Sequence, residues 1–208
     1  MKVDILSIDG SPSGRSIDLP DEIFGITPNE HVVYLTVKQY LANQRQGTNK
    51  TKGRSEVAGS TRKLHKQKGT GGSRKGDIKN PLYHGGGRVF GPEPRDYIMR
   101  LNKKVKVLAR KSALSSKVAD GSLVVIQDFT FDKPRTKDYM NILEGFGVTG
   151  KRSLIVIPQH DPNVFLSSRN IKKADCTTAS DIHTYQVLNA GKIILSESAV
   201  KVISEQLQ

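Results

Sequence analysis

Short apolar runs alternate with segments of helical periodicity over much of the chain. The runs are continuous, as in Leu123-Val124-Val125-Ile126, and the segments that follow repeat apolar residues every three or four positions. Continuously apolar strands that alternate with helices are typical of a mostly parallel sheet with helices on both faces. We predict strands at 123–126, 154–157 and 192–195, and helices at 136–146, 163–168 and 197–207.

The N-terminal part adds two shorter strands and a helix. The strands are predicted at 2–8 and 16–19, with a Gly/Ser/Pro turn between them. Thr27 has the properties of a helix N-cap, Pro28 suits the first helical position, and Glu30 would complete a capping box. The pattern therefore predicts a helix that continues to the middle of the chain.

The apolar face of this first helix includes Leu41 and extends to Gln44. A later helix is predicted to be capped by Asn102 and ended by Gly121, with Leu108 on its apolar stripe. Its lysines and arginines fall on the other faces. Both helices would flank the segment that separates them.

The segment 45–100 lacks the pattern of a packed element. Its large apolar residues are scattered without a period of 2 or 3.6, and glycine is frequent. We expect a single three-layer α/β domain, 1–208, with a central, mostly parallel sheet flanked by helices. Its body is 1–44 and 101–208, and 45–100 is a long, extended, irregular loop inserted after the first helix. We expect this loop to become ordered only on RNA.

The charge is concentrated in the same part of the chain. The net charge is +13, and residues 45–111 hold nineteen basic and four acidic side chains. Such a field attracts polyanions, and glycine lets a basic strand fit narrow gaps between phosphates. Folded RNA offers such crevices. The composition therefore favours an RNA-binding structural protein, not an enzyme.

The candidate RNA-binding residues are the basic side chains of this region. They are Arg45, Lys50, Lys52, Arg54, Arg62, Lys63, His65, Lys66, Lys68, Arg74, Lys75, Lys79, Arg88, Arg95, Arg100, Lys103, Lys104, Lys106, Arg110 and Lys111. Arginines can add bidentate phosphate contacts or stack on bases. The body is expected to dock through its basic helix, 102–117.

Catalytic and cofactor motifs are weak. Gly145–Lys151 has the glycine and lysine spacing of a phosphate-binding P-loop, but it follows a predicted helix, and Arg152 stands where a hydroxyl is needed. A glycine helix cap is the simpler interpretation. His160-Asp161 has no nucleophile at a matching spacing. A nucleotide-dependent enzyme and a free-standing nucleic-acid chaperone remain the alternatives, and we expect no cofactor.

Other classes find no support either. Cys176 is the single cysteine, which excludes an intrachain disulfide and a cysteine-based metal site. We expect no metal. The apolar runs are too short to cross a bilayer, so we expect no membrane association and a place in the reducing cytoplasm. No homo-oligomer is expected.

Several motifs together resemble one family. They are Tyr40-Leu41-Ala42-Asn43-Gln44-Arg45-Gln46-Gly47-Thr48, Gln67-Lys68-Gly69-Thr70-Gly71, Gly85-Gly86-Gly87-Arg88-Val89-Phe90-Gly91-Pro92, Pro94-Arg95-Asp96-Tyr97 and Leu101-Asn102-Lys103-Lys104-Val105. In this order and spacing the chain resembles bacterial ribosomal large-subunit protein four, the uL-four family, over essentially its whole length.

The resemblance implies a structural constituent of the large ribosomal subunit that binds 23S ribosomal RNA and aids early assembly. It also implies that the loop lines part of the nascent-polypeptide exit tunnel opposite protein twenty-two, among other large-subunit proteins. The implied tunnel-facing tip comprises Lys63, Lys66, Gln67, Lys68, Gly69, Thr70, Gly71 and Gly72. Leu64-His65 and Gly72 depart from the family pattern, where an aromatic-plus-basic pair and an arginine are common.

Overall fold

The computed structural model describes all 208 residues, Met1–Gln208. The chain divides into two compact units. The first comprises Met1–Leu41 and Arg100–Gln208, and the second is Ala42–Met99.

The first unit contains one six-stranded sheet in the order β2-β1-β3-β6-β4-β5. The strands are β1 (Lys2–Leu6), β2 (Pro12–Asp18), β3 (Leu123–Ile126), β4 (Ser153–Ile157), β5 (Ala174–Thr178) and β6 (Lys192–Ser196). Only β1 and β2 pair antiparallel, and every other neighbouring pair is parallel. The predicted mostly parallel sheet is therefore confirmed.

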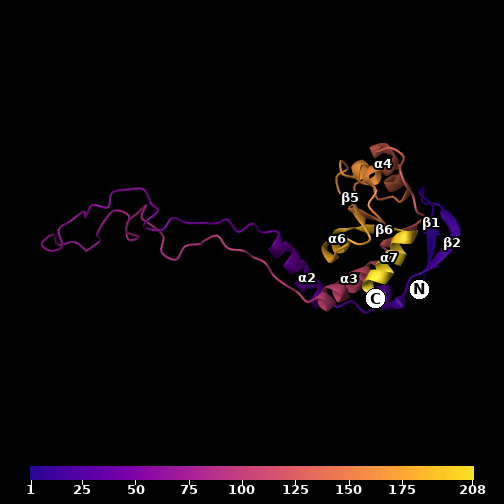
Figure 1. The fold of residues 1–208 in the computed structure, drawn as a ribbon, viewed down its shortest axis with the longest axis horizontal. Coiled ribbons are helices and arrows are strands. Elements are labelled where there is room, and N and C mark those ends of the chain that lie inside the picture. Colours follow the sequence, from indigo (N-terminus) through magenta and orange to yellow (C-terminus); the bar gives the residue numbers. More distant parts are fainter. The chain divides into compact units, whose positions relative to one another are not determined.

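Helices cover both faces of this sheet (Figure 1). They are α1 (Asp21–Phe24), α3 (Lys103–Ala119), α4 (Thr136–Gly145), α5 (Pro162–Ser168), α6 (Thr184–Asn189) and α7 (Glu197–Leu207), whereas α2 (Glu30–Asn43) contributes no residue to the apolar clusters on the sheet. One apolar cluster joins α1, α3, α6 and α7 to one face, and a second joins α4 and α5 to the other. The unit is thus the predicted three-layer α/β arrangement.

Helix α3 packs on the body through Leu114 and several small side chains. Ala109, Ser112 and Ala113 are buried, and the Ser115 hydroxyl donates a 3.0 Å hydrogen bond to the Ile23 carbonyl of α1. Leu108, which we predicted on the buried stripe, is instead 39% exposed. The prediction was wrong because the buried face of α3, which includes Ala109, Ala113 and Leu114, is rotated by about one residue from the predicted stripe.

Glycine ends two helices as predicted. Gly121 has φ +63°, and the N–H groups of Gly121 and Ser122 donate to the carbonyls of Val118 and Lys117. This pair of hydrogen bonds is a Schellman motif, which satisfies carbonyls that the helix leaves free. Gly147, at φ +62°, ends α4 with the same bonding pattern.

The predicted N-terminal caps were less accurate. Helix α2 starts at Glu30, and the Asn29 side chain accepts a hydrogen bond from the Val32 N–H at 3.1 Å. Asn29 therefore takes the capping role that we assigned to Thr27. Asn102 does stand at the N-cap position of α3, but its side chain makes no capping hydrogen bond. Leu41 is exposed, so it is not part of a buried face.

The second unit contains no helix or strand beyond the last residues of α2. Its two limbs are nevertheless hydrogen-bonded to one another. The Arg95 N–H donates to the Gly47 carbonyl, and the Thr51 N–H donates to the Pro92 carbonyl, at 3.1 and 3.0 Å. Further along, the Arg88 N–H donates to the carbonyl of Lys52. The backbone is irregular, as predicted, and hydrogen bonds rather than a core connect its limbs.

Candidate nucleic-acid interface

Most of the predicted RNA-binding side chains are exposed. The half-buried ones are Lys75, Lys79, Lys106, Arg110 and Lys111. All residues from 61 to 74, which include the expected tip, are exposed. The cations of both units are therefore accessible to a large polyanion.

Few of these cations have an acidic partner. In the second unit, the Lys50 ammonium lies 2.5 Å from the Glu56 carboxylate, and the Arg54 guanidinium lies 3.0 Å from the Asp77 carboxylate. These are the only ion pairs within the unit. The other cations of the unit keep an unneutralised charge, which makes close packing of the limbs unfavourable unless an outside anion is present.

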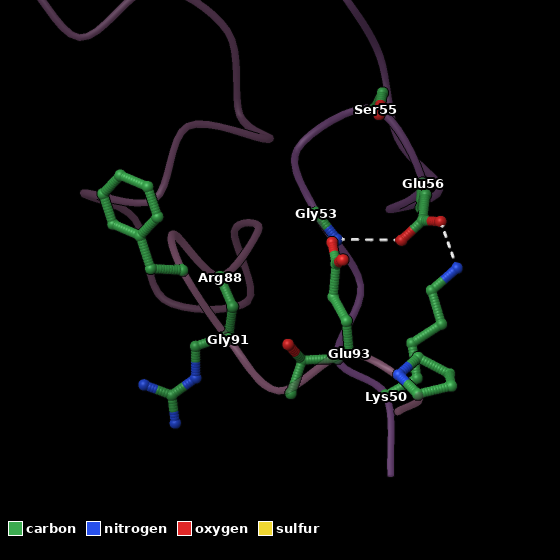
Figure 2. A pocket seen from close by; sticks show the side chains of 10 residues that line it. Lys50, Gly53, Ser55, Glu56, Arg88, Gly91 and Glu93 are labelled. Atoms are coloured by element: carbon green, nitrogen blue, oxygen red, sulfur yellow. Dashed lines mark hydrogen bonds and ion pairs between the residues drawn. The ribbon is translucent and has the colours of Figure 1, made fainter. Parts of the chain in front are cut away.

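The Glu56 carboxylate stabilises a local turn of the second unit (Figure 2). It accepts hydrogen bonds from the Lys50 ammonium and from the Gly53 N–H. These bonds lower the pKa of Glu56, and its hydrogen bond and charge raise the pKa of Lys50. Both groups are thus held in their charged forms. In Figure 2 the Arg88 side chain extends away from this pair, which leaves its guanidinium available to another group.

Two glycines allow the limbs to approach one another. A Cβ on Gly87 would collide with the backbone of Arg54, and a Cβ on Gly91 would collide with the Thr51 side chain. These contacts explain why glycine is needed in the motif at 85–91. At Gly69, by contrast, a Cβ would meet open space, with no atom beyond the adjoining residues within 4 Å. The tip glycines have no such role within the protein itself.

Two arginine side chains lie against the ring of Tyr97 near the ends of the second unit. The Arg45 and Arg95 guanidinium groups lie 3.7 and 4.9 Å from the centre of its ring. The hydrogen bond and charge of Arg95, with the charge of Arg45, lower the pKa of Tyr97. We did not single out Tyr97 from the sequence, although an aromatic residue two positions from an arginine was a usable signal.

The segments that resemble nucleotide-binding or acid-base motifs in the sequence have structural roles. Gly145–Lys151 lies between α4 and β4, so it follows a helix and includes the Schellman motif at Gly147. Asp161 caps α5 by accepting from the Asn163 N–H at 2.9 Å, and Asp128 accepts from the Ser198 N–H at 3.0 Å. The P-loop interpretation therefore lacks the strand-to-helix context that it needs.

Three further features concern the single cysteine, metal binding and membrane spans. Burial raises the pKa of the Cys176 thiol to about 12. No three His, Cys, Asp or Glu side chains lie together in an arrangement that could hold a metal ion. None of the helices combines the length and apolar character that a membrane span requires.

Comparison with known proteins gives one consistent result. The family model described as the ribosomal protein L4/L1 family matches residues 17–206. A Parabacteroides distasonis protein named large ribosomal subunit protein uL4 is 54% identical over 208 residues, covering 100% of both chains. Proteins of the same name from Bacteroides fragilis and Flavobacterium psychrophilum are each 53% identical, covering 100% of this chain and 100% and 99% of their own.

Proposed function

The chain belongs to the ribosomal protein L4/L1 family, and from this membership we propose that its basic segment 45–111 binds 23S ribosomal RNA. A structural role in the large ribosomal subunit follows from the family. The observation that carries the RNA-binding proposal is the charge of this segment, nineteen basic against four acidic side chains. Only two ion pairs neutralise any of it within the second unit.

The exposed tip supports a role in the exit tunnel. Residues 63–72 are all exposed, and the backbone at Gly69 and Gly71 has open space around it. Bare peptide groups can approach RNA closely, and lysines such as Lys66 and Lys68 supply positive charge. We propose that this tip lines a narrow part of the tunnel beside protein twenty-two and faces the nascent polypeptide.

The basic helix α3 supplies a further contact on the first unit. Lys103 and Lys104 are exposed at its N-terminus, while Arg110 and Lys111 are half-buried along it. Cations at a helix N-terminus gain nothing from the helix dipole, so an external anion is the better partner for them. We propose that α3 docks the body on RNA while the loop neutralises converging phosphates, which aids early subunit assembly in the cytoplasm.

Sedimentation of the native protein tests this proposal. The protein should be recovered with large ribosomal subunits on a sucrose gradient and should prefer 23S ribosomal RNA over an unrelated RNA of equal length. A free-standing chaperone would be recovered mainly outside ribosomal particles and would show no such preference. Either of these last two results would overturn the proposal.

The enzyme alternative has a separate test. Binding of ATP or GTP that disappears in Lys151→Ala would favour a nucleotide-dependent enzyme. We expect no saturable nucleotide binding in either protein, because Gly145–Lys151 ends a helix and does not begin one.

A further inference from the structure

A second group of cations lies at the amino ends of four parallel strands in the first unit. These residues precede or begin β4, β5 and β6, or lie in the last turn of the helix that leads to β3. We call them the amino-edge patch: Lys117, Lys151, Arg152, Lys172, Lys173 and Lys192. None of them belongs to the basic segment 45–111.

The strand register brings these residues together. Ser153 of β4 lies opposite both Ala174 of β5 and Lys192 of β6, and Leu123 of β3 lies opposite Ile193. The four strands therefore begin at one edge of the sheet. At about 4.8 Å between neighbouring strands, the edge is about 14 Å wide, which is enough for more than one phosphate group.

The cations of the patch bond only to uncharged groups. The Lys117 ammonium donates to the Ala190 carbonyl at 2.7 Å, the Lys173 ammonium to the Gly150 carbonyl at 3.1 Å, and the Lys192 ammonium to the Phe146 carbonyl at 3.2 Å. Arg152 donates to the Asn189 side chain. No residue of the patch has a carboxylate within 4.0 Å.

Helix capping explains part of this arrangement. Ala190 and Phe146 directly follow α6 and α4, so Lys117 and Lys192 stabilise carbonyls at helix C-termini. Capping does not explain Lys151 and Lys172, whose exposed side chains make no hydrogen bond or ion pair. These two add charge to a surface that is already positive, which costs free energy unless an anion binds there.

The opposite edge of the sheet is richer in acids, although its loop after β3 also carries Lys133 and Arg135, and the amino edge also carries Asp120 and Glu144. Asp128, Asp161 and Asp181 lie in the loops after three of the strands, and Glu197 begins α7 directly after β6. Each of these carboxylates has a partner: the first three accept hydrogen bonds within their loops or from Ser198, and Glu197 pairs with Arg15 at 3.4 Å. These four acids therefore have partners within the fold, whereas Lys151 and Lys172 at the amino edge have none.

We propose that the amino-edge patch binds RNA phosphates other than those bound by residues 45–111. The choice of RNA as the anion rests on the proposed function. Lys117 lies about 21 Å along the axis of α3 from Lys103, at 1.5 Å per residue. One phosphate cannot contact both ends of this helix, so the patch and the N-terminus of α3 contact different phosphates.

A pair of matched double variants of the full chain tests the patch. Lys151→Gln with Lys172→Gln removes two exposed charges without breaking a capping bond. The control, Lys133→Gln with Lys137→Gln, removes two exposed charges from the other end of the same unit. The measurement is the slope of log Kobs against log salt concentration for binding to large-subunit ribosomal RNA.

The patch variant should lose about 1.4 to 1.8 units of this slope, at 0.7 to 0.9 per phosphate, and the control should keep its slope. Equal slopes in the two variants would overturn the proposal while leaving the proposed function intact. Loss of binding to a polyglutamate peptide, with RNA binding unchanged, would assign the surface to an acidic protein and also overturn it. If the wild type sediments apart from large subunits while the slopes still differ, the proposed function fails and the patch stands.

Discussion

The two units of the chain are stabilised by different interactions. The first buries apolar side chains on both faces of its sheet, with Ile155 and Ile194 fully buried at the centre. In the second unit only Asp77 and Gly87 are buried. Its apolar residues, such as Phe90 and Ile98, are exposed. The first unit has a core that offsets the entropy of folding, whereas the second has hydrogen bonds and two ion pairs but no core.

This difference shows how one chain can combine a stable body with a segment rich in exposed positive charge. Cations that face water cost little, whereas cations in a core would be strongly unfavourable. The absence of a core therefore lets charge accumulate between 45 and 100. The cross-limb hydrogen bonds keep the limbs in register without burying these cations.

An isoleucine-to-alanine substitution in each unit should give the largest difference in the free energy of unfolding. Ile155→Ala should lower the free energy of unfolding by about 2–5 kcal/mol, because it opens a cavity in the core. Ile98→Ala should change it by less than about 0.5 kcal/mol, because this side chain is 68% exposed. Urea unfolding followed by circular dichroism measures both. Similar losses would show that the second unit has a core of its own.

Replacing a glycine that has a positive φ in the second unit should weaken RNA binding without changing the stability of the body. Gly47→Ala places a Cβ at φ +67° against the Arg95 carbonyl. The left-handed backbone alone costs an alanine about 1–2 kcal/mol, which corresponds to a loss of RNA affinity of about five- to thirtyfold. Filter binding measures the affinity.

Gly14→Ala is the matched control for this strain. Gly14 has φ +74°, with no atom near its Cβ position, in the first unit. Gly14→Ala should lower the free energy of unfolding of the body by about 1–2 kcal/mol and leave RNA affinity unchanged. Equal effects of the two variants on binding would contradict the separation of the units.

Alkaline pH should destabilise the first unit. Burial raises the pKa of the Cys176 thiol to about 12, whereas an unfolded thiol ionises near pH ~8.5. Between these values the unfolded chain has lost a proton that the folded chain keeps, so stability falls as pH rises. Cys176→Ala should remove part of this decline between pH 7 and 10. The remainder should persist, because burial also raises the pKa of Tyr139.

Removing the exposed Lys50–Glu56 ion pair should have the smallest effect on RNA binding. Glu56→Gln removes the carboxylate that neutralises Lys50. Lys50 can then contact a phosphate, so the salt dependence of RNA binding should steepen by up to about 0.9 units. Thermal unfolding of the body should not change. A shallower slope would show that the Glu56 turn itself is needed for binding.

The sequence predicted best what depends on local pattern. The strands β3, β4 and β6 are buried on both faces, so their apolar runs located them within one residue. Strand β5 was missed because its sequence, Ala-Asp-Cys-Thr-Thr, is polar and pairs with only one neighbour, β4. Helix α6 was missed because six residues are too few to show a helical period.

The candidate site was predictable in its composition but not in its contacts. Exposed cations follow from charge density and the lack of apolar pattern. The Arg54–Asp77 ion pair and the stacking of Arg45 on Tyr97 join residues that lie far apart in the sequence. Likewise, the amino-edge patch requires the order of the strands, which the sequence does not show. Such contacts depend on the register between segments.

The most direct test of the account compares the full chain with a variant that lacks residues 48–97. The measurement is the salt dependence of binding to 23S ribosomal RNA, with circular dichroism to establish that the body is folded. We expect the variant to fold and to lose most of the slope, at about 0.7 to 0.9 units per phosphate that the segment no longer neutralises. A folded variant that binds the RNA with an unchanged slope would contradict the account.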